Sequence, residues 1–213
     1  MPERLNVNPN RMELLKLKRR LAVARRGHHL LKEKLDELMK PFLAMVKEAA
    51  RLRSGLEAEL VEAHGLFTLA RSGMSPAELE QALEHPRARA SVEARSRPVV
   101  SVMAPDLSVE VEGGIDCYGF ASTPALLDVS LVRFEELLPG LVELAQQEKT
   151  VQMLAEEIEK TRRRVNALEY VLLPQLEETI RHITMKLDEF ERSNLTRLMK
   201  IKEMAAQESR RPA

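Results

Sequence analysis

The chain has 213 residues, with 31% charged and 3% aromatic side chains, no tryptophan and a formal net charge of zero at pH 7, a composition that favours helices meeting along a thin apolar seam over a thick globular core. Cys117 is the only cysteine, which excludes an internal disulfide and a CxxC metal site and fits a reducing compartment. No apolar run approaches the roughly 18 residues of a membrane span, and the N-terminus lacks the apolar core of a signal peptide, so we expect neither direct membrane insertion nor secretion.

A long helix is predicted over residues 8–71, after a short tail at 1–7 that we expect to be disordered. Apolar or small residues recur in this helix in alternating steps of three and four, a heptad pattern sustained well past the length of an ordinary globular helix. The positions of this N-terminal stripe are Leu14, Leu17, Leu21, Ala24, Leu31, Leu35, Leu38, Phe42, Met45, Ala49, Leu52 and Leu56. Such a stripe requires a partner helix.

The first 35 residues are strongly basic although the whole chain is neutral. They contain ten Lys or Arg side chains against three acidic ones, a net charge of +7. A solvated face beside the seam, a nucleic-acid-binding patch and a charged tip inside another protein are three interpretations of this charge. Nucleic acid is disfavoured as a partner because the region has no interleaved aromatic residues, no zinc-ligand spacing and no motif for a DNA-recognition helix.

Residues 72–124 are predicted to form a central insert with a different pattern. Ser75, followed by Pro76 and Glu78, indicates the start of a short helix that ends near Glu84, because proline is favoured in the first helical turn and an acidic residue suits that end of a helix.

Short β-branched runs follow in the same insert. Pro105 and Asp106 indicate a turn after the first run, and Gly113 and Gly114 indicate another after the second. We expect a small hairpin or meander that is too small to be stable alone and packs against the helices or a partner. The predicted strands are 99–103, 107–112 and 115–120.

A second long helix is predicted over residues 125–207, followed by a tail at 208–213 that we expect to be disordered. Ser122, Thr123 and Pro124 provide the signal for the start of this helix. Its apolar stripe comprises Val151, Ile158, Val165, Leu168, Leu172, Leu176, Ile180, Ile183, Leu187, Phe190 and Ile201.

The two stripes predict the fold class, which is all-α dominated. The N- and C-terminal helices form a long antiparallel two-helix coiled coil, with the short central helix and the small β-hairpin at the opposite end from the termini. Pro41, Pro139 and Pro174 lie inside the predicted helices, and we expect a bend or break at each. If the helix ends are flush, Pro41 lies opposite about Leu172, where the C-terminal stripe also has a stutter that locally unwinds a supercoil.

No catalytic, cofactor or metal site is predicted. The chain has no GxxxxGK[ST] phosphate loop and no HExxH motif. His28 and His29 are adjacent and therefore point about 100° apart on a helix, so His28 is interpreted as a tolerated polar break in the seam. Cys117 lacks a neighbouring base and is interpreted as strand packing.

Several ordered segments resemble the D subunit of the rotary V-type and A-type ATPases. The resemblance spans nearly the whole chain and is weakest over about 75–97, which makes it far more specific than a heptad pattern. The segments that carry it are Asn8–Leu21, Arg26–His28, Leu30–Lys32, Tyr118–Ala121, Glu135–Pro139, Glu156–Tyr170 and Met185–Glu189.

This resemblance implies a non-catalytic axle in a central rotor, on the cytoplasmic face of a membrane. The family's axle transmits torque between a ring of catalytic and regulatory subunits and a membrane ring that moves ions. The basic terminal end is expected inside the catalytic ring, the β segment against a small second rotor subunit, and the tip in a socket subunit on the membrane ring.

The resemblance also implies two sets of contact residues. Basic side chains are expected to meet acidic loops of the surrounding ring: Arg19, Arg20, Arg25, Arg26, Arg162, Arg163 and Arg164. Apolar residues of the β segment are expected to contact the small rotor subunit: Val100, Val102, Val109, Val111, Tyr118 and Phe120.

Two other classes of protein share part of this pattern. A prefoldin-like chaperone also joins two long antiparallel helices through β-hairpins, but it predicts exposed apolar clamps at the helix tips, where this chain is basic. A generic coiled-coil scaffold accounts for the stripes and the charge but not for the ordered family segments.

Overall fold

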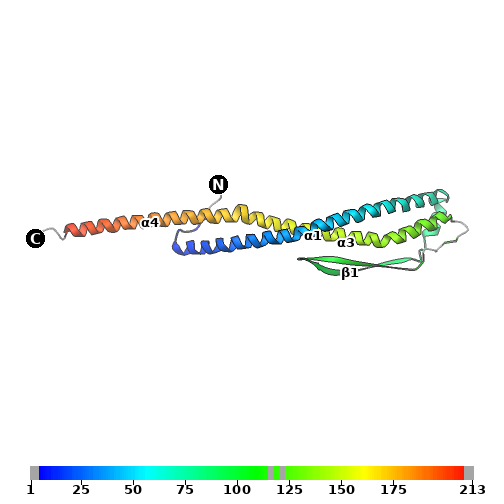
Figure 1. The fold of residues 1–213 in the computed structure, drawn as a ribbon, viewed down its shortest axis with the longest axis horizontal. Coiled ribbons are helices and arrows are strands. Elements are labelled where there is room, and N and C mark those ends of the chain that lie inside the picture. The colour runs from blue at the N-terminus through cyan, green and yellow to red at the C-terminus, as the bar shows by residue number, and fades with distance from the viewer. Residues whose placement is uncertain (1–4, 115–117, 120–122, 209–213) are drawn as a thin grey trace. The chain divides into compact units, whose positions relative to one another are not determined.

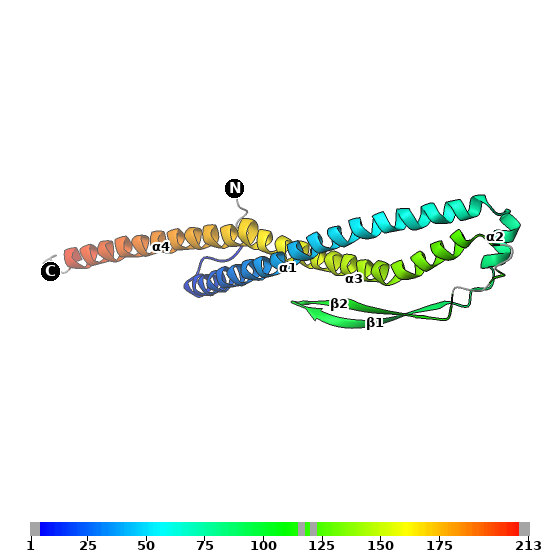
Figure 2. The ribbon, with the colours of Figure 1, turned by 45° about the vertical axis from the view of Figure 1, so that its right-hand side comes forward.

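In a computed structural model, which describes residues 5–114, 118–119 and 123–208, the chain folds into long helices and one two-stranded sheet (Figures 1 and 2). This arrangement confirms the predicted fold class, with long N- and C-terminal helices, a short central helix and an antiparallel hairpin. None of the helices in the described ranges is long and apolar enough to cross a membrane. The elements in chain order are α1 (Arg11–Ser72), α2 (Pro76–Leu83), β1 (Arg89–Val99), β2 (Val102–Glu112), α3 (Ala125–Ala167), the π-helical turn η1 (Leu168–Leu172) and α4 (Leu173–Glu208).

The chain divides into two compact units, and α1 contributes its first part to one unit and its later part to the other. The terminal unit consists of Met1–Asp36 and Lys160–Ala213, and the central unit consists of Glu37–Glu159. Each unit buries its own part of the heptad stripes, so each is described by itself.

In the terminal unit, the first part of α1 runs antiparallel to α4. Its core contains the stripe residues Leu17 and Ala24 of α1 with Leu176 and Ile183 of α4, all buried as predicted. An ion pair of 2.8 Å between Arg25 and Glu177 links the same two helices at their surface. The seam is therefore apolar inside and charged at its edge, which is the pattern of a two-helix coiled coil.

The segment before α1 also belongs to this unit. Leu5 and Val7 pack against the core cluster, and the Leu5 N–H donates a hydrogen bond of 3.2 Å to Thr179 Oγ1. The side chain of Asn10 then caps α1 by accepting a 2.6 Å bond from the Glu13 N–H. The predicted tail at 1–7 thus includes two residues that pack against the terminal unit, because both are apolar and lie on its buried cluster.

In the central unit, the later part of α1 packs against α3. Leu56 and Ala63 of α1 meet Leu137 of α3 in one buried cluster. The helices approach closely at Gly140, where an added Cβ would lie 2.7 Å from Leu56 Cδ2. A glycine at this position therefore sets how near the two helices come.

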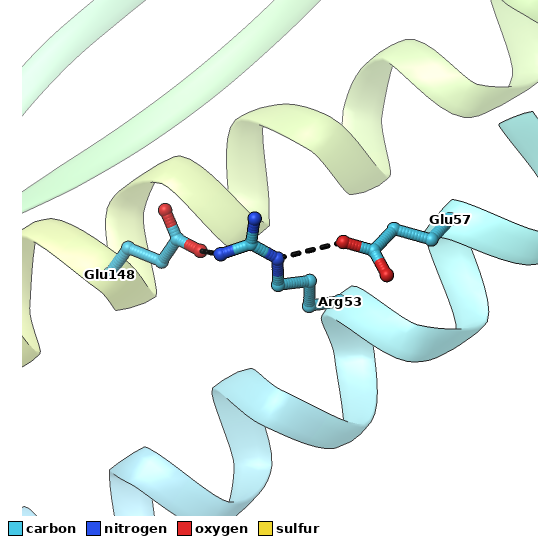
Figure 3. A network of polar contacts seen from close by, with 3 residues as sticks. All are labelled: Arg53, Glu57 and Glu148. Atoms are coloured by element: carbon cyan, nitrogen blue, oxygen red, sulfur yellow. Dashed lines mark hydrogen bonds and ion pairs between the residues drawn. The ribbon is translucent and has the colours of Figure 1, made fainter.

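Figure 3 shows the ion-pair network that joins α1 to α3 in the central unit. Arg53 Nε lies 2.8 Å from Glu57 Oε1 on its own helix, and Arg53 Nη1 lies 3.3 Å from Glu148 Oε1 of α3. The hydrogen bond to Glu57 and the charge of Glu148 both raise the pKa of Arg53. Because all three groups are exposed, the network aligns the helices more than it stabilises them.

The short helix α2 begins with the predicted cap. The Ser75 hydroxyl accepts a 3.3 Å hydrogen bond from the Glu78 N–H, and Glu78 Oε2 accepts a 2.8 Å bond from the Ser75 N–H, which forms a capping box. Ala82 of this helix is buried with Ala70 of α1 and Leu127 of α3, so α2 closes one end of the central unit's core.

The hairpin differs from its sequence-based prediction. The segment predicted as a first strand, 99–103, contains the hairpin turn at Val100 and Ser101, and β1 lies entirely before it. Val100 has φ +56°, a value that a β-branched residue rarely adopts. The predicted third strand, 115–120, falls mostly outside the described residues, as does Cys117.

Pro105 lies inside β2 instead of ending a strand. The N–H of Leu107 points away from β1 and donates a 2.7 Å hydrogen bond to Gln146 Oε1 of α3. Leu107 and its partner Ala94 therefore form a pair that exchanges no hydrogen bonds between the strands. Backbone nitrogens two residues apart point the same way, so the nitrogen of Pro105 also points outwards, and so does that of Pro98 on β1. Neither proline therefore costs a ladder bond, which is why both are tolerated.

The prolines in the helices have different effects. α1 continues through Pro41 and α3 continues through Pro139, so the breaks predicted there do not occur. Pro174 instead lies just after η1, where the Leu173 N–H bonds to the Leu168 carbonyl five residues back. The wider π-turn accommodates the ring of Pro174 and its missing donor. It also takes up the extra residue of the predicted stutter between Leu172 and Leu176.

Candidate interaction surfaces

The seven arginines predicted to contact a ring all belong to the terminal unit. Four lie on α1 and three on α3, and all seven side chains are exposed. The three on α3 are consecutive and sit between two buried seam residues, Thr161 and Val165. Because Thr161 and Val165 share the inner face, the residues between them project away from the seam and fan around the outer surface.

The arginines differ in the partners they already have. Arg25 pairs with Glu177, and Arg26 Nε donates a 3.4 Å bond to the carbonyl of Ala22. In the described ranges, four of the predicted arginines form no ion pair and no hydrogen bond, so their charge is available to another protein. These are Arg19, Arg20, Arg162 and Arg164.

The residues predicted to contact a second rotor subunit lie mainly on β2. Val109 and Val111 are half-buried and alternate with exposed polar residues, whereas Val100 is exposed at the turn. Val102 is half-buried at the opposite end of the strand. Leu107, Val109 and Val111 therefore form one apolar face of the strand, and Val102 lies on the opposite face.

The other two predicted contacts have a different setting. Tyr118 packs against the cluster of Ala70, Ala82 and Leu127, and its hydroxyl donates a 2.5 Å hydrogen bond to Asp128 Oδ1. Phe120 lies outside the described residues. Of the predicted set, Tyr118 thus has a clear role within the chain, because it holds the segment before α3 against the core.

A cavity of about 280 Å³ lies at the base of the hairpin, in the central unit. Its wall is largely apolar, with Ala90 and Val111 from the strands facing Leu131, Phe134 and Leu138 of α3. The predicted contact residue Val111 therefore faces this cavity, and not open solvent alone.

No metal-binding cluster of three or more His, Cys, Asp or Glu side chains occurs among the residues that the structure describes. His28 lies on the seam side of α1, with Nε2 3.4 Å from Glu169 Oε2 of η1. This contact gives His28 a polar partner at the edge of the seam, where its sequence position predicted a polar break.

The outer end of α4 was not predicted as a surface. Arg11, the first residue of α1, forms an ion pair with Glu191, whereas α4 continues to Glu208, so the two helices do not end flush. Phe190 and Ile201, which the stripe placed in the seam, are 62% and 57% exposed for that reason. The sequence held a signal for this surface, because the stripe of the second helix extends further than the first helix can cover.

Comparison with known proteins places the whole chain in one group. Residues 13–203 match the family model of the ATP synthase D subunit. The chain is 54% identical over 202 residues to the V-type ATP synthase D subunit of Thermoanaerobacter sp. (strain X514), covering 94% of this chain and 97% of that protein. It is 53% identical over 209 residues to the V-type ATP synthase D subunit of Acetivibrio thermocellus, covering 96% and 94%. The V-type ATP synthase D subunit of Clostridium botulinum (strain Langeland) is 53% identical over 206 residues, covering 94% and 95%.

Proposed function

Because the chain belongs to the family of ATP synthase D subunits, we propose that it is the central rotor axle of a V/A-type rotary ATPase or ATP synthase. The observation that carries this proposal is identity above one half along nearly the full length of relatives that are named as D subunits of V-type ATP synthases. These relatives give no support to a prefoldin-like chaperone or a generic scaffold. The axle transmits torque between the catalytic ring and the ion-translocating ring and carries no catalytic residue itself.

The terminal unit is the part that enters the ring of catalytic and regulatory subunits. Its support is the outward fan of arginines on α1 and α3, four of which have no partner in the described ranges. Each exposed pair with an acidic loop would contribute only about 0.2–1 kcal/mol. Such contacts orient the axle among several similar sites without binding it so tightly that rotation stops.

The central unit provides the contacts to the rest of the rotor. The apolar face of β2, with Leu107, Val109 and Val111, meets the small second rotor subunit, and the tip of the unit sits in the socket subunit on the membrane ring. The chain itself lies at the cytoplasmic face as a peripheral subunit.

Two long helices suit the transmission of torque for a physical reason. Each seam residue inserts between four residues of the facing helix, so a twist applied at one end displaces many packed side chains at once. Buried leucines such as Leu17 and Leu176 hold this seam in the terminal unit, and Leu56 and Leu137 hold it in the central unit.

Co-expression with the ring and rotor subunits tests the assignment. One copy of this chain should purify with a hexameric ring, and mass measurement of the intact complex gives the stoichiometry. A chain that purifies alone while the ring assembles with a different central subunit contradicts the proposal.

The ring contacts need a separate test in the assembled complex. Reversing Arg162 and Arg164 to Glu should weaken the coupling of ATP hydrolysis to rotation, because both side chains project from the seam without a partner in the described ranges. Reversing Lys47 and Arg51, two exposed cations on α1 in the central unit, is the matched control. Equal coupling in the two double variants contradicts the proposed ring contact.

A further inference from the structure

The π-helical turn η1 exposes two large apolar side chains on the surface of the terminal unit. Tyr170 is 72% exposed and Val171 is 52% exposed, and Ala167, just before the turn, is exposed as well. They follow the three consecutive arginines of α3 within about two helical turns. Tyr and Arg are enriched among the residues that dominate protein–protein binding, so this surface has the composition of a binding site.

The geometry of the turn explains where Tyr170 points. Leu168 and Leu172, at the two ends of η1, are half-buried on the seam side, and Leu172 packs against the core cluster of the unit. Tyr170 lies midway between them and therefore projects from the opposite side of the helix, away from the seam. The extra residue of the π-turn widens the helix on that outer side, because both ends stay on the seam. Such π-turns occur frequently at functional sites.

The carboxylates around Tyr170 already have partners within the chain. Three occur between residues 162 and 178, and each contacts a basic side chain. The pairs are Glu169 with His28 at 3.4 Å, Glu177 with Arg25 at 2.8 Å and Glu178 with Arg181 at 3.7 Å. The stretch of α1 beside them, 25–32, contains no acidic residue. The acidic groups near Tyr170 are therefore balanced before any partner arrives.

The cations before the turn are less engaged. Arg162 and Arg164 form no ion pair and no hydrogen bond in the part of the chain that the structure describes, whereas Arg163 has an interaction within the chain. Arg164 precedes Val171 by seven residues, about two helical turns, so both lie on the same side of the helix. A partner that complements this surface therefore offers an apolar pocket with an acidic rim.

We propose that Tyr170 is an aromatic anchor that inserts into an apolar, acid-rimmed pocket on a subunit of the surrounding ring. Val171 packs against the wall of that pocket, and Arg162 and Arg164 meet its rim. A tyrosine suits this role because its rigid ring buries a large area with few torsions to fix, while its hydroxyl bonds at the rim. The contact rests on the proposed function, since it requires the terminal unit to lie inside the ring, and it adds an apolar component to the contacts of the arginines.

Surface plasmon resonance with the full chain and an assembled ring that lacks its own axle tests the anchor. Tyr170→Ser should weaken binding about tenfold or more, mainly through faster dissociation. Tyr170→Phe keeps the aromatic ring and should retain most of the affinity. Val61→Ser removes a 73% exposed valine from α1 in the central unit, so it is the matched control and should bind like the wild type.

A second experiment separates the position of Tyr170 from its presence. Deletion of Glu169 in a Pro174→Ala background removes the extra residue of η1 and places Tyr170 directly after Leu168, about 100° from the seam instead of opposite it. Affinity for the ring should then fall as it does in Tyr170→Ser, although the tyrosine is retained. Glu169→Gln in the same background changes the contact with His28 without shifting the turn, and it should bind like its parent.

Three results would overturn the proposal. These are equal binding of Tyr170→Ser and the wild type, equal losses in Tyr170→Ser and Val61→Ser, and full affinity after deletion of Glu169. In each case the wild-type chain still binds the ring, so the axle assignment stands and only the anchor is wrong. If the wild-type chain does not bind the ring at all, the proposed function fails and the anchor fails with it.

Discussion

Deleting one residue from the π-helical turn tests how the two helical registers of the terminal unit are joined. The stripe steps by four from Leu168 to Leu172 and again by four to Leu176, one residue more than a regular alternation of three and four allows. The turn η1 absorbs this extra residue. Deletion of Tyr170, whose side chain is 72% exposed, should convert η1 to an ordinary α-helix and keep Leu176 on the seam.

The deletion belongs in a Pro174→Ala background, because a regular helix would place the proline ring against the preceding turn. We expect the free energy of unfolding to stay within about 1 kcal/mol of the Pro174→Ala parent, since only exposed atoms are lost. Deletion of Arg181 in the same background is the matched control. It rotates the residues after it by about 100°, which removes Ile183, 1% exposed, from the seam and costs about 1.5–3 kcal/mol for that side chain alone.

Urea unfolding of the full chain, followed by far-UV circular dichroism, measures both free energies. Hydrogen exchange of peptides from the first part of α1 and from α4 shows whether the loss is confined to the terminal unit. Equal costs for the two deletions, or a larger cost for deletion of Tyr170, would refute the idea that η1 is a one-residue insertion.

The hairpin and α2 offer three further predictions. Val100→Gly should raise the hydrogen-exchange protection of the hairpin several-fold, because glycine relieves about 1 kcal/mol of strain at φ +56°, whereas Val100→Ile should bring no gain. Gly113→Ala should lower that protection by more than about 1 kcal/mol, since the added Cβ would lie 2.4 Å from the Arg87 carbonyl oxygen in a backbone with φ +95°. The bonds from Ser75, first from its N–H and then from its side chain, lower the pKa of Glu78 below its ordinary value of 4.5. Because the pKa of Glu78 is lower in the folded than in the unfolded chain, its contribution to the stability of α2 is present above the unfolded pKa and is lost as the pH falls through the folded pKa. An NMR titration should therefore show α2 fraying in acid. Glu78→Gln should remove this pH dependence.

The core of both units could be predicted from the sequence because burial in a coiled coil is a local, periodic property. Leu17, Leu38 and Leu56 on the first stripe, and Leu176 and Ile183 on the second, are all buried where the heptad pattern places them. The start of α2 was equally visible, since Ser75, Pro76 and Glu78 lie within one helical turn of each other in the chain.

The hairpin was harder to predict because its signals conflict. β1 consists mainly of exposed Arg, Ser, Glu and Ala residues, so it lacks the alternation of large apolar side chains that identifies a strand. The turn falls on Val100, a residue type that favours strands, and Pro105 resembles a turn residue although it lies within β2. Whether a strand tolerates a proline such as Pro105 depends on whether its backbone nitrogen points away from the partner strand. The register of strand pairing decides this, and the sequence alone does not fix that register.

The length of helix overlap also could not be obtained from periodicity. The stripe continues through Phe190 to Ile201 without a change in spacing, but α1 begins at Arg11 beside Glu191. A heptad pattern identifies the face that a helix buries, whereas the partner's end is fixed by the chain's other contacts, including those of Leu5 and Val7.

The outward nitrogens of Pro98 and Pro105 have a consequence for the behaviour of the hairpin before it meets any partner. Each strand of a two-stranded sheet is an edge, and an exposed edge can recruit strands from other molecules. Each proline removes one hydrogen-bond donor from the outer side of its strand, on β1 and on β2 respectively, and on β2 the neighbouring donor of Leu107 is already bonded to Gln146. A foreign strand that aligned along either side would meet a gap in its hydrogen-bond ladder, so the two prolines protect the hairpin against aggregation through its edges.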